Sequence, residues 1–220
     1  LAKNWGFCLR HERVSVVNRG RGIEDEARRQ RHGIYQRYSA DIICLGHHCE
    51  DQAETLLLRL FRGSGLLGLA SMRRSESLQG MLLQRPFLSV GVADIVDFNR
   101  RWGVEWVDDP SNLVDDNYDR NYIRCRVRPC IEARWEHLCA TLARNATQLA
   151  ETQDVLAAYL EKDIRSIRTK WYGIEYLAAK EFKQHSYEVQ CHILHHYMRS
   201  YGIIVPSQRR LYEFIRQVNI

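Results

Sequence analysis

The sequence lacks the features that mark fibrous, disordered and membrane-spanning chains. It has only four prolines in 220 residues, and its 13 glycines form no repeat, which excludes a collagen-like or low-complexity chain. Its apolar runs, such as 42–45 and 56–58, are far shorter than the roughly 20 residues that a helix needs to cross a bilayer. The composition therefore indicates a globular chain with no membrane-spanning segment.

Paired cysteines are also missing. The seven cysteines include no Cys-x-x-Cys pair and are odd in number, so neither a disulfide framework nor a four-cysteine zinc site is expected. No signal peptide or anchor is visible, and we expect a reducing, cytoplasmic location. Because the sequence begins without methionine and ends within an amphipathic pattern, we expect both ends to be cuts in a longer chain.

Lysine is scarce, and arginine supplies 27 of the 32 cationic side chains. The net charge is +5 and the isoelectric point is near 8.9. The planar guanidinium group suits phosphate, so this bias favours a polyanionic partner. Surface arginine that only maintains solubility is the alternative interpretation.

Strand and helix patterns alternate through roughly the first 110 residues. Short β-branched or apolar segments predict strands at 12–18, 41–45 and 104–107, and amphipathic segments predict helices at 23–38, 51–62 and 90–102. Asp51 starts the second helix, with Glu54 three residues later as in a capping box. This alternation predicts an α/β fold with a parallel sheet.

After Pro129 the patterns become helical only, at 131–164, 183–200 and 207–218. This change of class predicts a domain boundary near residue 130. We therefore expect residues 1–130 to form part of an α/β domain and residues 131–220 to form a small all-helical domain.

The clearest chemistry follows the predicted strand 41–45. Gly46, His47, His48 and Asp51 would lie beyond its carboxyl end, where open α/β sheets bind ligands and helices expose free N–H groups. The sequence Arg62-Gly63-Ser64 follows the next helix, and its glycine would let backbone approach a phosphate closely. These positions are candidates for binding a nucleotide.

Two other interpretations of this stretch stay open on spacing alone. Histidines and carboxylates can ligate a metal, although adjacent histidines diverge and no third histidine lies nearby. The histidines could also be ordinary loop residues, with Gly-Ser-Gly acting only as a helix stop. A second group, His192, His195 and His196, has metal-like spacing but lies among apolar residues, so we interpret it as structural.

Residues 47–72 read HHCEDQAETLLLRLFRGSGLLGLASM, which resembles the HHxxDQxET…RGSGxxGLxxM segment of tRNA(Ile)-lysidine synthetases, a family of PP-loop ATP-pyrophosphatases. Further resemblances follow the family's order. They are GIE with AR at 22–28, RPFL at 85–88, WVDDPSN at 106–112 and YDRNYIR at 118–124.

The sequence also departs from the family's pattern. PP-loop enzymes carry an SGGxDS loop that binds the ATP phosphates, and no such loop occurs here, so we expect the chain to start after it. Position 50 is Glu where the family often has Asp. The family's last C-terminal domain also has no counterpart, and independent catalysis by these residues is therefore not expected.

The resemblance implies an ATP-dependent ligase that modifies the wobble cytidine of a minor isoleucine tRNA with a CAU anticodon. ATP adenylates the C2 carbonyl oxygen and releases pyrophosphate, and the lysine amine then displaces AMP to give lysidine. ATP, Mg²⁺, L-lysine and this tRNA are the implied ligands, and a homodimer is possible because family members are often dimers.

Within this framework we hypothesise roles for individual residues. Arg62 with Gly63 and Ser64 would hold phosphate, together with Gly46 and His47. His48 and Asp51, with Arg62, would act at the reacting groups. No residue is assigned to a metal.

A second cluster of arginines lies at 120, 124, 126 and 128. In a helix, Arg120, Arg124 and Arg128 form one basic stripe, which we interpret, with Arg126 and with Arg28, as contacting tRNA. A solvated or ion-paired face is the alternative. Two alternative functions also stay open, another PP-loop tRNA-modifying enzyme such as a cytidine thiolase, and a non-catalytic RNA-binding module.

Overall fold

A computed structural model describes residues 2–17, 23–38, 40–78, 80–107, 118–203 and 205–218. The chain divides into two compact units, Leu1–Leu149 and Ala150–Ile220. The division falls within the long helix α8 (Leu138–Ile167). The boundary near residue 130 that the change of pattern predicts lies earlier in the chain and stays a prediction.

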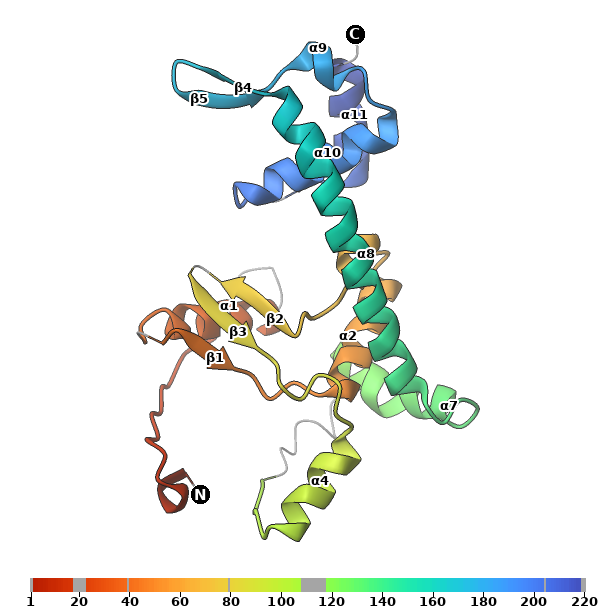
Figure 1. The fold of residues 1–220 in the computed structure, drawn as a ribbon. Helices are drawn as coiled ribbons and strands as arrows, with labels where there is room; N and C mark the ends of the chain where they lie inside the picture. Colours follow the sequence, from red (N-terminus) through yellow and green to blue (C-terminus); the bar gives the residue numbers. More distant parts are fainter. Residues whose placement is uncertain are drawn as a thin grey trace. The chain divides into compact units, whose positions relative to one another are not determined.

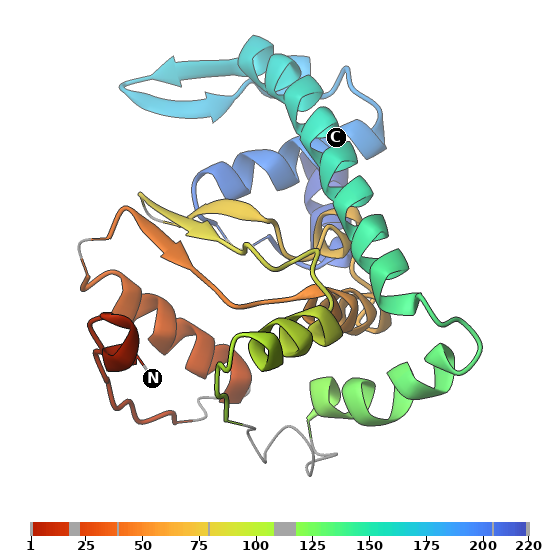
Figure 2. The same cartoon turned by 60° about the horizontal axis from the view of Figure 1, so that its bottom comes forward.

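The first unit has an α/β fold built on a three-stranded sheet in the order β1-β3-β2. Strand β1 (Ile42–Cys44) is parallel to β3 (Met81–Gln84), and β2 (Ser75–Leu78) is antiparallel to β3. The sheet is therefore mixed, whereas the sequence predicted a parallel one. Figures 1 and 2 show β1 and β3 both pointing towards the end of the sheet where α2 and α4 begin.

The helices of this unit follow the sequence closely where the apolar periodicity is strong. They are η1 (Ala2–Trp5), α1 (Ile23–Tyr35), α2 (Cys49–Phe61), α3 (Leu66–Leu69), α4 (Val92–Arg101), α6 (Asp119–Tyr122), the π-helical turn η2 (Ile123–Val127) and α7 (Arg128–Glu132). The predicted helices at 23–38, 51–62 and 90–102 are thus confirmed as α1, α2 and α4, with ends shifted by at most three residues.

Two predicted strands in this unit are wrong. Residues 12–17 and 104–107 have no regular structure, and Val14 and Val17 are exposed. β-branched residues favour a strand only where a neighbouring strand can pair with them, and the described residues pair no strand with either segment. The predicted buried strand at 41–45 is correct as β1, but Ile42 and Cys44 are exposed because both point to the same face of the sheet, which the described residues leave open there.

The second unit is helical apart from one hairpin. Strands β4 (Arg168–Trp171) and β5 (Ile174–Leu177) pair antiparallel after α8, followed by α9 (Ala179–Phe182), α10 (Tyr187–Ser200) and α11 (Gln208–Val218). The expectation of an all-helical second domain is therefore wrong over 168–177. The turn places Tyr172 and Gly173 at positive φ, 47° and 79°, which suits a tight hairpin.

The main core of the second unit forms where α8, α10 and α11 bring apolar residues together. Ile164, Ile193 and Ile215 are at most 1% exposed and belong to one apolar cluster. Of the three histidines interpreted as structural, His196 has its Nε2 3.2 Å from Glu161 Oε2, and the interpretation stays a prediction. Within the described residues no His, Cys, Asp or Glu cluster is arranged to hold a metal ion.

Candidate functional site

The candidate site lies where β1 ends and α2 begins. Gly46 is exposed, and His47 and His48 are half-buried in the short connection. His48 is the N-cap of α2, and its backbone N–H donates to the Asp51 carboxylate across 3.1 Å. The helix thus starts earlier than predicted, and Asp51 serves as the third residue of its first turn rather than as the cap.

His48 lies between two carboxylates. Its Nδ1 is 2.9 Å from Glu50 Oε2, and its Nε2 is 3.3 Å from Asp51 Oδ2. Burial alone lowers the pKa of His48, but the hydrogen bond to Glu50 and the charges of Asp51, Glu50 and Glu54 outweigh it and raise that pKa above its ordinary value. A carboxylate at each ring nitrogen thus favours the cationic form of His48.

Glu50 connects this histidine to the start of α4. Both of its carboxylate oxygens accept from the Val92 N–H, at 3.1 and 3.0 Å. Burial alone raises the pKa of Glu50, but the hydrogen bonds from His48 and Val92 outweigh it, and the net shift is downward. Glu50, which stands where the family often has Asp, therefore connects the His48 ring at the start of α2 to the first residue of α4.

We expect His48→Gln to remove a stabilisation that depends on pH. The pKa of His48 is raised in the folded protein, so its contribution is complete below the unfolded value of about 6.5 and disappears as pH rises through the folded pKa. Wild type should therefore exceed the variant in unfolding free energy by more at about pH 6 than at about pH 9. Urea unfolding at both pH values measures this difference. A difference that grows with pH would contradict the cationic assignment.

Unlike His48, whose ring contacts carboxylates, His47 contacts a guanidinium group. Its Nδ1 accepts from Arg85 Nε across 3.3 Å. Burial lowers the pKa of His47, Asp51 acts to raise it, and the nearby Arg85, Arg120 and Arg31 lower it further, so the net shift is downward. The pKa values of the two adjacent histidines thus shift in opposite directions, since burial and Arg85 act on His47 while carboxylates lie at both ring nitrogens of His48.

Glu54 is the centre of the site's ion pairs. It is fully buried, and its oxygens lie 2.8 Å from Arg124 Nη2, 3.2 Å from Arg128 Nη1 and 3.4 Å from Arg120 Nε. Asp51 Oδ1 accepts from Arg120 and Arg124 at 3.2 and 3.4 Å. The predicted arginine stripe therefore exists, and it faces α2.

The π-helical turn η2 keeps the three arginines on one face. Four residues of α-helix turn about 40° past a full revolution, so a spacing of four drifts around an ordinary helix. The wider turn of η2, from Ile123 to Val127, offsets that drift between Arg120 and Arg128. All three side chains consequently reach Glu54.

The Arg62-Gly63-Ser64 sequence ends α2. Arg62 is exposed and pairs with Asp119 across 2.8 Å. The backbone N–H groups of Arg62, Gly63 and Ser64 donate to Leu58, Leu60 and Arg59 carbonyls, which leaves the Arg62 guanidinium and the Ser64 hydroxyl as donors for a ligand. Gly63 has φ +70°, the left-handed conformation that ends a helix.

A second glycine in this motif is required by packing. A Cβ on Gly68 would lie 2.6 Å from Ser64 Cβ, and the Gly68 carbonyl accepts from Arg59 across 2.7 Å. The motif thus folds the chain back on α2. Its glycines are explained by this turn, while Arg62 has only an exposed ion pair.

The remaining sequence-predicted residues lie on the surface. Arg28 is exposed on α1, and Arg126 is exposed on η2. A Cβ on Gly46 would meet no atom within 4 Å. Three residues of the site were missed by the sequence reasoning: Glu50, Glu54 as an arginine acceptor, and Arg85. Arg85 could have been found, since it opens the RPFL motif at 85–88.

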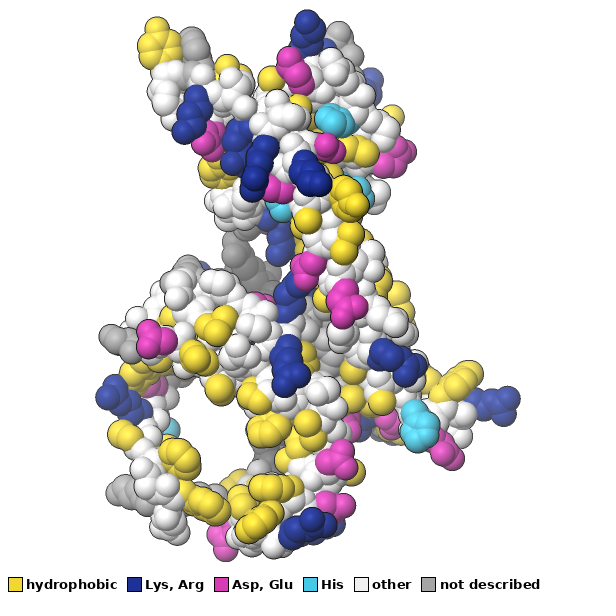
Figure 3. All heavy atoms as spheres, in the orientation of Figure 1, with side chains coloured by type: hydrophobic (Ala, Val, Ile, Leu, Met, Phe, Trp, Pro, Cys, Tyr) yellow, Lys and Arg dark blue, Asp and Glu magenta, His cyan; other side chains and the backbone are white. Residues whose placement is uncertain are grey.

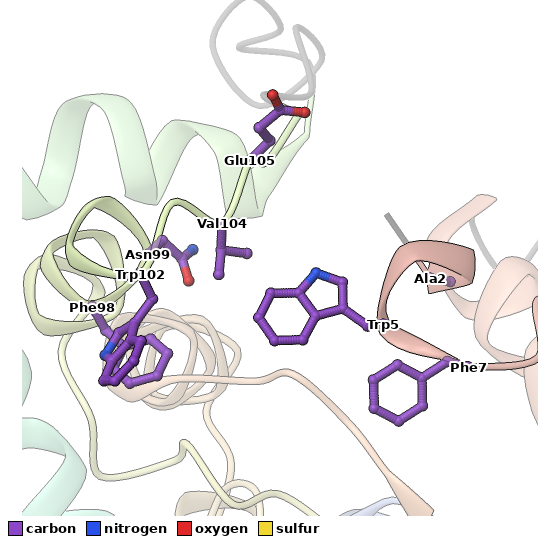
Figure 4. Close-up of a pocket in the computed structure, with 8 residues that line it drawn as sticks. All are labelled: Ala2, Trp5, Phe7, Phe98, Asn99, Trp102, Val104 and Glu105. Atoms are coloured by element: carbon purple, nitrogen blue, oxygen red, sulfur yellow. The ribbon is translucent and has the colours of Figure 1, made fainter.

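A separate apolar pocket of about 560 Å³ lies between η1 and α4 (Figure 4). Trp5 and Phe7 line one side, and Phe98, Trp102 and Val104 line the other. Figure 3 shows apolar side chains gathered over α4. The pocket contains none of the candidate site residues.

Two general properties of the described residues also bear on function. No helix there is both long and apolar enough to cross a membrane. The seven cysteines are all free thiols, and burial, reinforced by Glu132, raises the pKa of Cys139 to about 12.

Comparison with known families gives a match to the PP-loop domain over residues 1–131. The chain is also 37% identical over 218 residues to a tRNA(Ile)-lysidine synthase of Azoarcus sp. (strain BH72), covering 97% of this chain and 47% of that protein. It is 39% identical over 170 residues to a tRNA(Ile)-lysidine synthase of Pseudomonas aeruginosa, covering 76% and 38%. The chain spans less than half the length of these curated relatives.

Proposed function

This chain belongs to the PP-loop family, and from that membership we propose that the protein is a tRNA(Ile)-lysidine synthase. It would use ATP to ligate lysine to C2 of the wobble cytidine in a tRNA(Ile) with a CAU anticodon. The observation that supports this most is the convergence of two distant motifs. The HHxxDQxET segment and the YDRNYIR segment meet through Glu54 and Asp51 with Arg120 and Arg124.

The proposed reaction has two steps, adenylation of the cytidine and displacement of AMP by lysine. ATP would adenylate the C2 carbonyl oxygen and lose pyrophosphate, and the lysine amine would then form the C–N bond at C2 as AMP leaves. Such a ligase must neutralise phosphate charge and hold its reactants together. The described residues supply the groups for these two tasks: the guanidinium of Arg62, the neutral imidazole proposed for His47 and the imidazolium proposed for His48.

The end of α2, at Arg62 and Ser64, offers donors that suit an ATP phosphate. The Arg62 guanidinium is 59% exposed, and Ser64 adds a hydroxyl beside it. We assign phosphate binding to these two side chains, because the backbone N–H groups around Gly63 are used within the helix end. His47 adds a donor at the other end of α2.

Mg²⁺ does not fit the described carboxylates. Asp51 and Glu54 both accept hydrogen bonds from arginine, and such ion-paired oxygens are poor ligands for a hard cation that needs several free oxygens. None of the described residues is therefore assigned to the ion. Glu50 is likewise engaged, by His48 and Val92.

The five arginines proposed as tRNA contacts differ in their ion pairs. Arg120, Arg124 and Arg128 are engaged by Glu54, so their first role is to fix α6, η2 and α7 against α2. Arg126 and Arg28 have exposed side chains on η2 and α1. We propose these two as phosphate contacts, with the engaged arginines adding positive potential beneath.

We expect Arg126→Glu to weaken tRNA binding and to lower the slope of log K against log salt by about one phosphate contact, roughly 0.9. Filter binding over a range of salt concentrations measures both quantities. Arg216→Glu is the matched control, because Arg216 is exposed on α11 and forms an ion pair with Glu213 on the same helix. Equal effects of the two variants would show that net charge alone is responsible.

Pyrophosphate release tests the function directly. The complete protein should release pyrophosphate when offered ATP and the CAU-anticodon tRNA, and should incorporate labelled lysine into that tRNA. Release without lysine incorporation, but with sulfur incorporation, would favour a thiolase-like enzyme. RNA binding with no nucleotide consumption would favour a non-catalytic RNA-binding module and overturn the proposal.

A further inference from the structure

Several hydrogen bonds fix the position of Arg85 beside the site. It follows β3, and its side chain is only 3% exposed. Its Nη1 donates to the Arg73 carbonyl at 2.7 Å, and its Nη2 donates to Glu76 at 2.8 Å. Its backbone N–H donates to the Arg74 carbonyl at 2.8 Å. These contacts fix the direction in which the Nε–H group points.

That donor points at His47 Nδ1, 3.3 Å away. A guanidinium has only donors and stays protonated in proteins, so Nδ1 must keep its lone pair to accept. A cationic His47 would place one N–H against another and two positive charges in contact. The ring is therefore neutral, and its single proton lies on Nε2.

The Nε2 side of the ring has no hydrogen-bond partner among the described residues. Within the described part of the chain, the contact with Arg85 is the only hydrogen bond of the His47 ring, and the residue is half-buried at the carboxyl end of β1. The charged groups around it are Asp51, Arg85, Arg120 and Arg31, and their combined effect with burial lowers the pKa of His47.

We propose that Arg85 is a positioning residue that holds His47 neutral with its proton on Nε2, so that His47 donates a hydrogen bond to a phosphate or carbonyl oxygen of the nucleotide substrate. The nature of that oxygen rests on the proposed function, whereas the state of the ring does not. His48, whose two nitrogens face Glu50 and Asp51, is the structural partner of the pair. One His-His sequence thus provides a neutral donor and a fixed cation.

Nitrogen NMR of the intact protein tests the ring's state without any assay of activity. With ¹⁵N-labelled histidine at about pH 7, His47 should show an unprotonated Nδ1 and a protonated Nε2, and His48 should show two protonated nitrogens. The His47→Gln variant assigns the resonances. A His47 protonated on Nδ1, or on both nitrogens, overturns the proposal in the wild-type protein itself.

Two variants test whether Arg85 is responsible. Arg85→Met should move the His47 titration to higher pH and mix its tautomers, whereas Glu76→Gln, which keeps the Nε contact, should leave both unchanged. An unchanged His47 in folded Arg85→Met contradicts the positioning role. If Arg85→Met does not fold, Arg85→Lys is measured instead, and it should also mix the tautomers because a lysine cannot make all three contacts.

Activity then separates this inference from the proposed function. If the protein forms lysidine, Arg85→Met should lower kcat/KM by at least about tenfold, as a wrong histidine tautomer does elsewhere, and should shift its pH profile. If the protein forms no lysidine, the proposed function fails while the NMR result still decides the state of His47.

Discussion

Replacing Glu54 by glutamine is expected to lower the free energy of unfolding of the first unit by about 3–5 kcal/mol, the range for breaking a buried ion pair. Glu54 is fully buried and is the acceptor that Arg120, Arg124 and Arg128 share. The amide keeps the size of the side chain but leaves three guanidinium groups around a neutral group. Their desolvation is then no longer offset.

Urea unfolding monitored by tryptophan fluorescence and circular dichroism measures this loss. Asp97→Asn is the matched control, because Asp97 pairs with Arg100 at 3.6 Å on the exposed face of α4, and exposed pairs contribute about 0–1 kcal/mol. A Glu54→Gln variant as stable as Asp97→Asn would show that the cluster contributes little to holding α6, η2 and α7 on α2.

Arg62→Ala should give the opposite combination, with a large loss of activity and little change in stability. We expect lysidine formation by the complete protein to fall by about 10²–10³-fold, the cost of removing one preorganised donor from a charged reacting group. The unfolding free energy should change by less than about 1 kcal/mol, because Arg62 and Asp119 form an exposed pair.

Asp119→Asn is the control that separates the guanidinium from its ion pair. It removes the partner of Arg62 but keeps the guanidinium, so single-turnover rates should stay within a few-fold of wild type. Near-normal turnover by Arg62→Ala would refute the phosphate role, and an equal loss in both variants would assign the effect to the pair. Circular dichroism of each variant confirms that the fold is intact.

The sequence predicted the local parts of the site well. The leucines of α2 repeat at helical spacing, and Gly63 was correctly predicted as a stop because a left-handed residue ends many helices. The start of α2 was predicted at residue 51, whereas the helix begins at Cys49 with His48 as its N-cap. An N-cap of Ser, Thr, Asp or Asn is the usual signal, and histidine gives none.

Partners far apart in the chain could not be derived from spacing. Glu54 is 66–74 residues from the arginines that it binds, and only the fold decides whether a basic stripe faces solvent or a buried carboxylate. The strand predicted at 12–18 is absent over the described residues 12–17, for the related reason that β propensity needs a pairing partner. The hairpin 168–177 was missed because its turn is Tyr172-Gly173 and not the usual Asn-Gly or Asp-Gly.

The length of the η2 segment is as important as its composition. If the same residues wound as ordinary α-helix, the eight positions from Arg120 to Arg128 would turn about 80° past two full revolutions, and Arg128 would point away from Glu54. A single carboxylate could then no longer serve all three guanidinium groups. A related sequence without the wide turn should therefore either be one residue shorter in this segment or carry a different side chain at position 54, some seventy positions upstream.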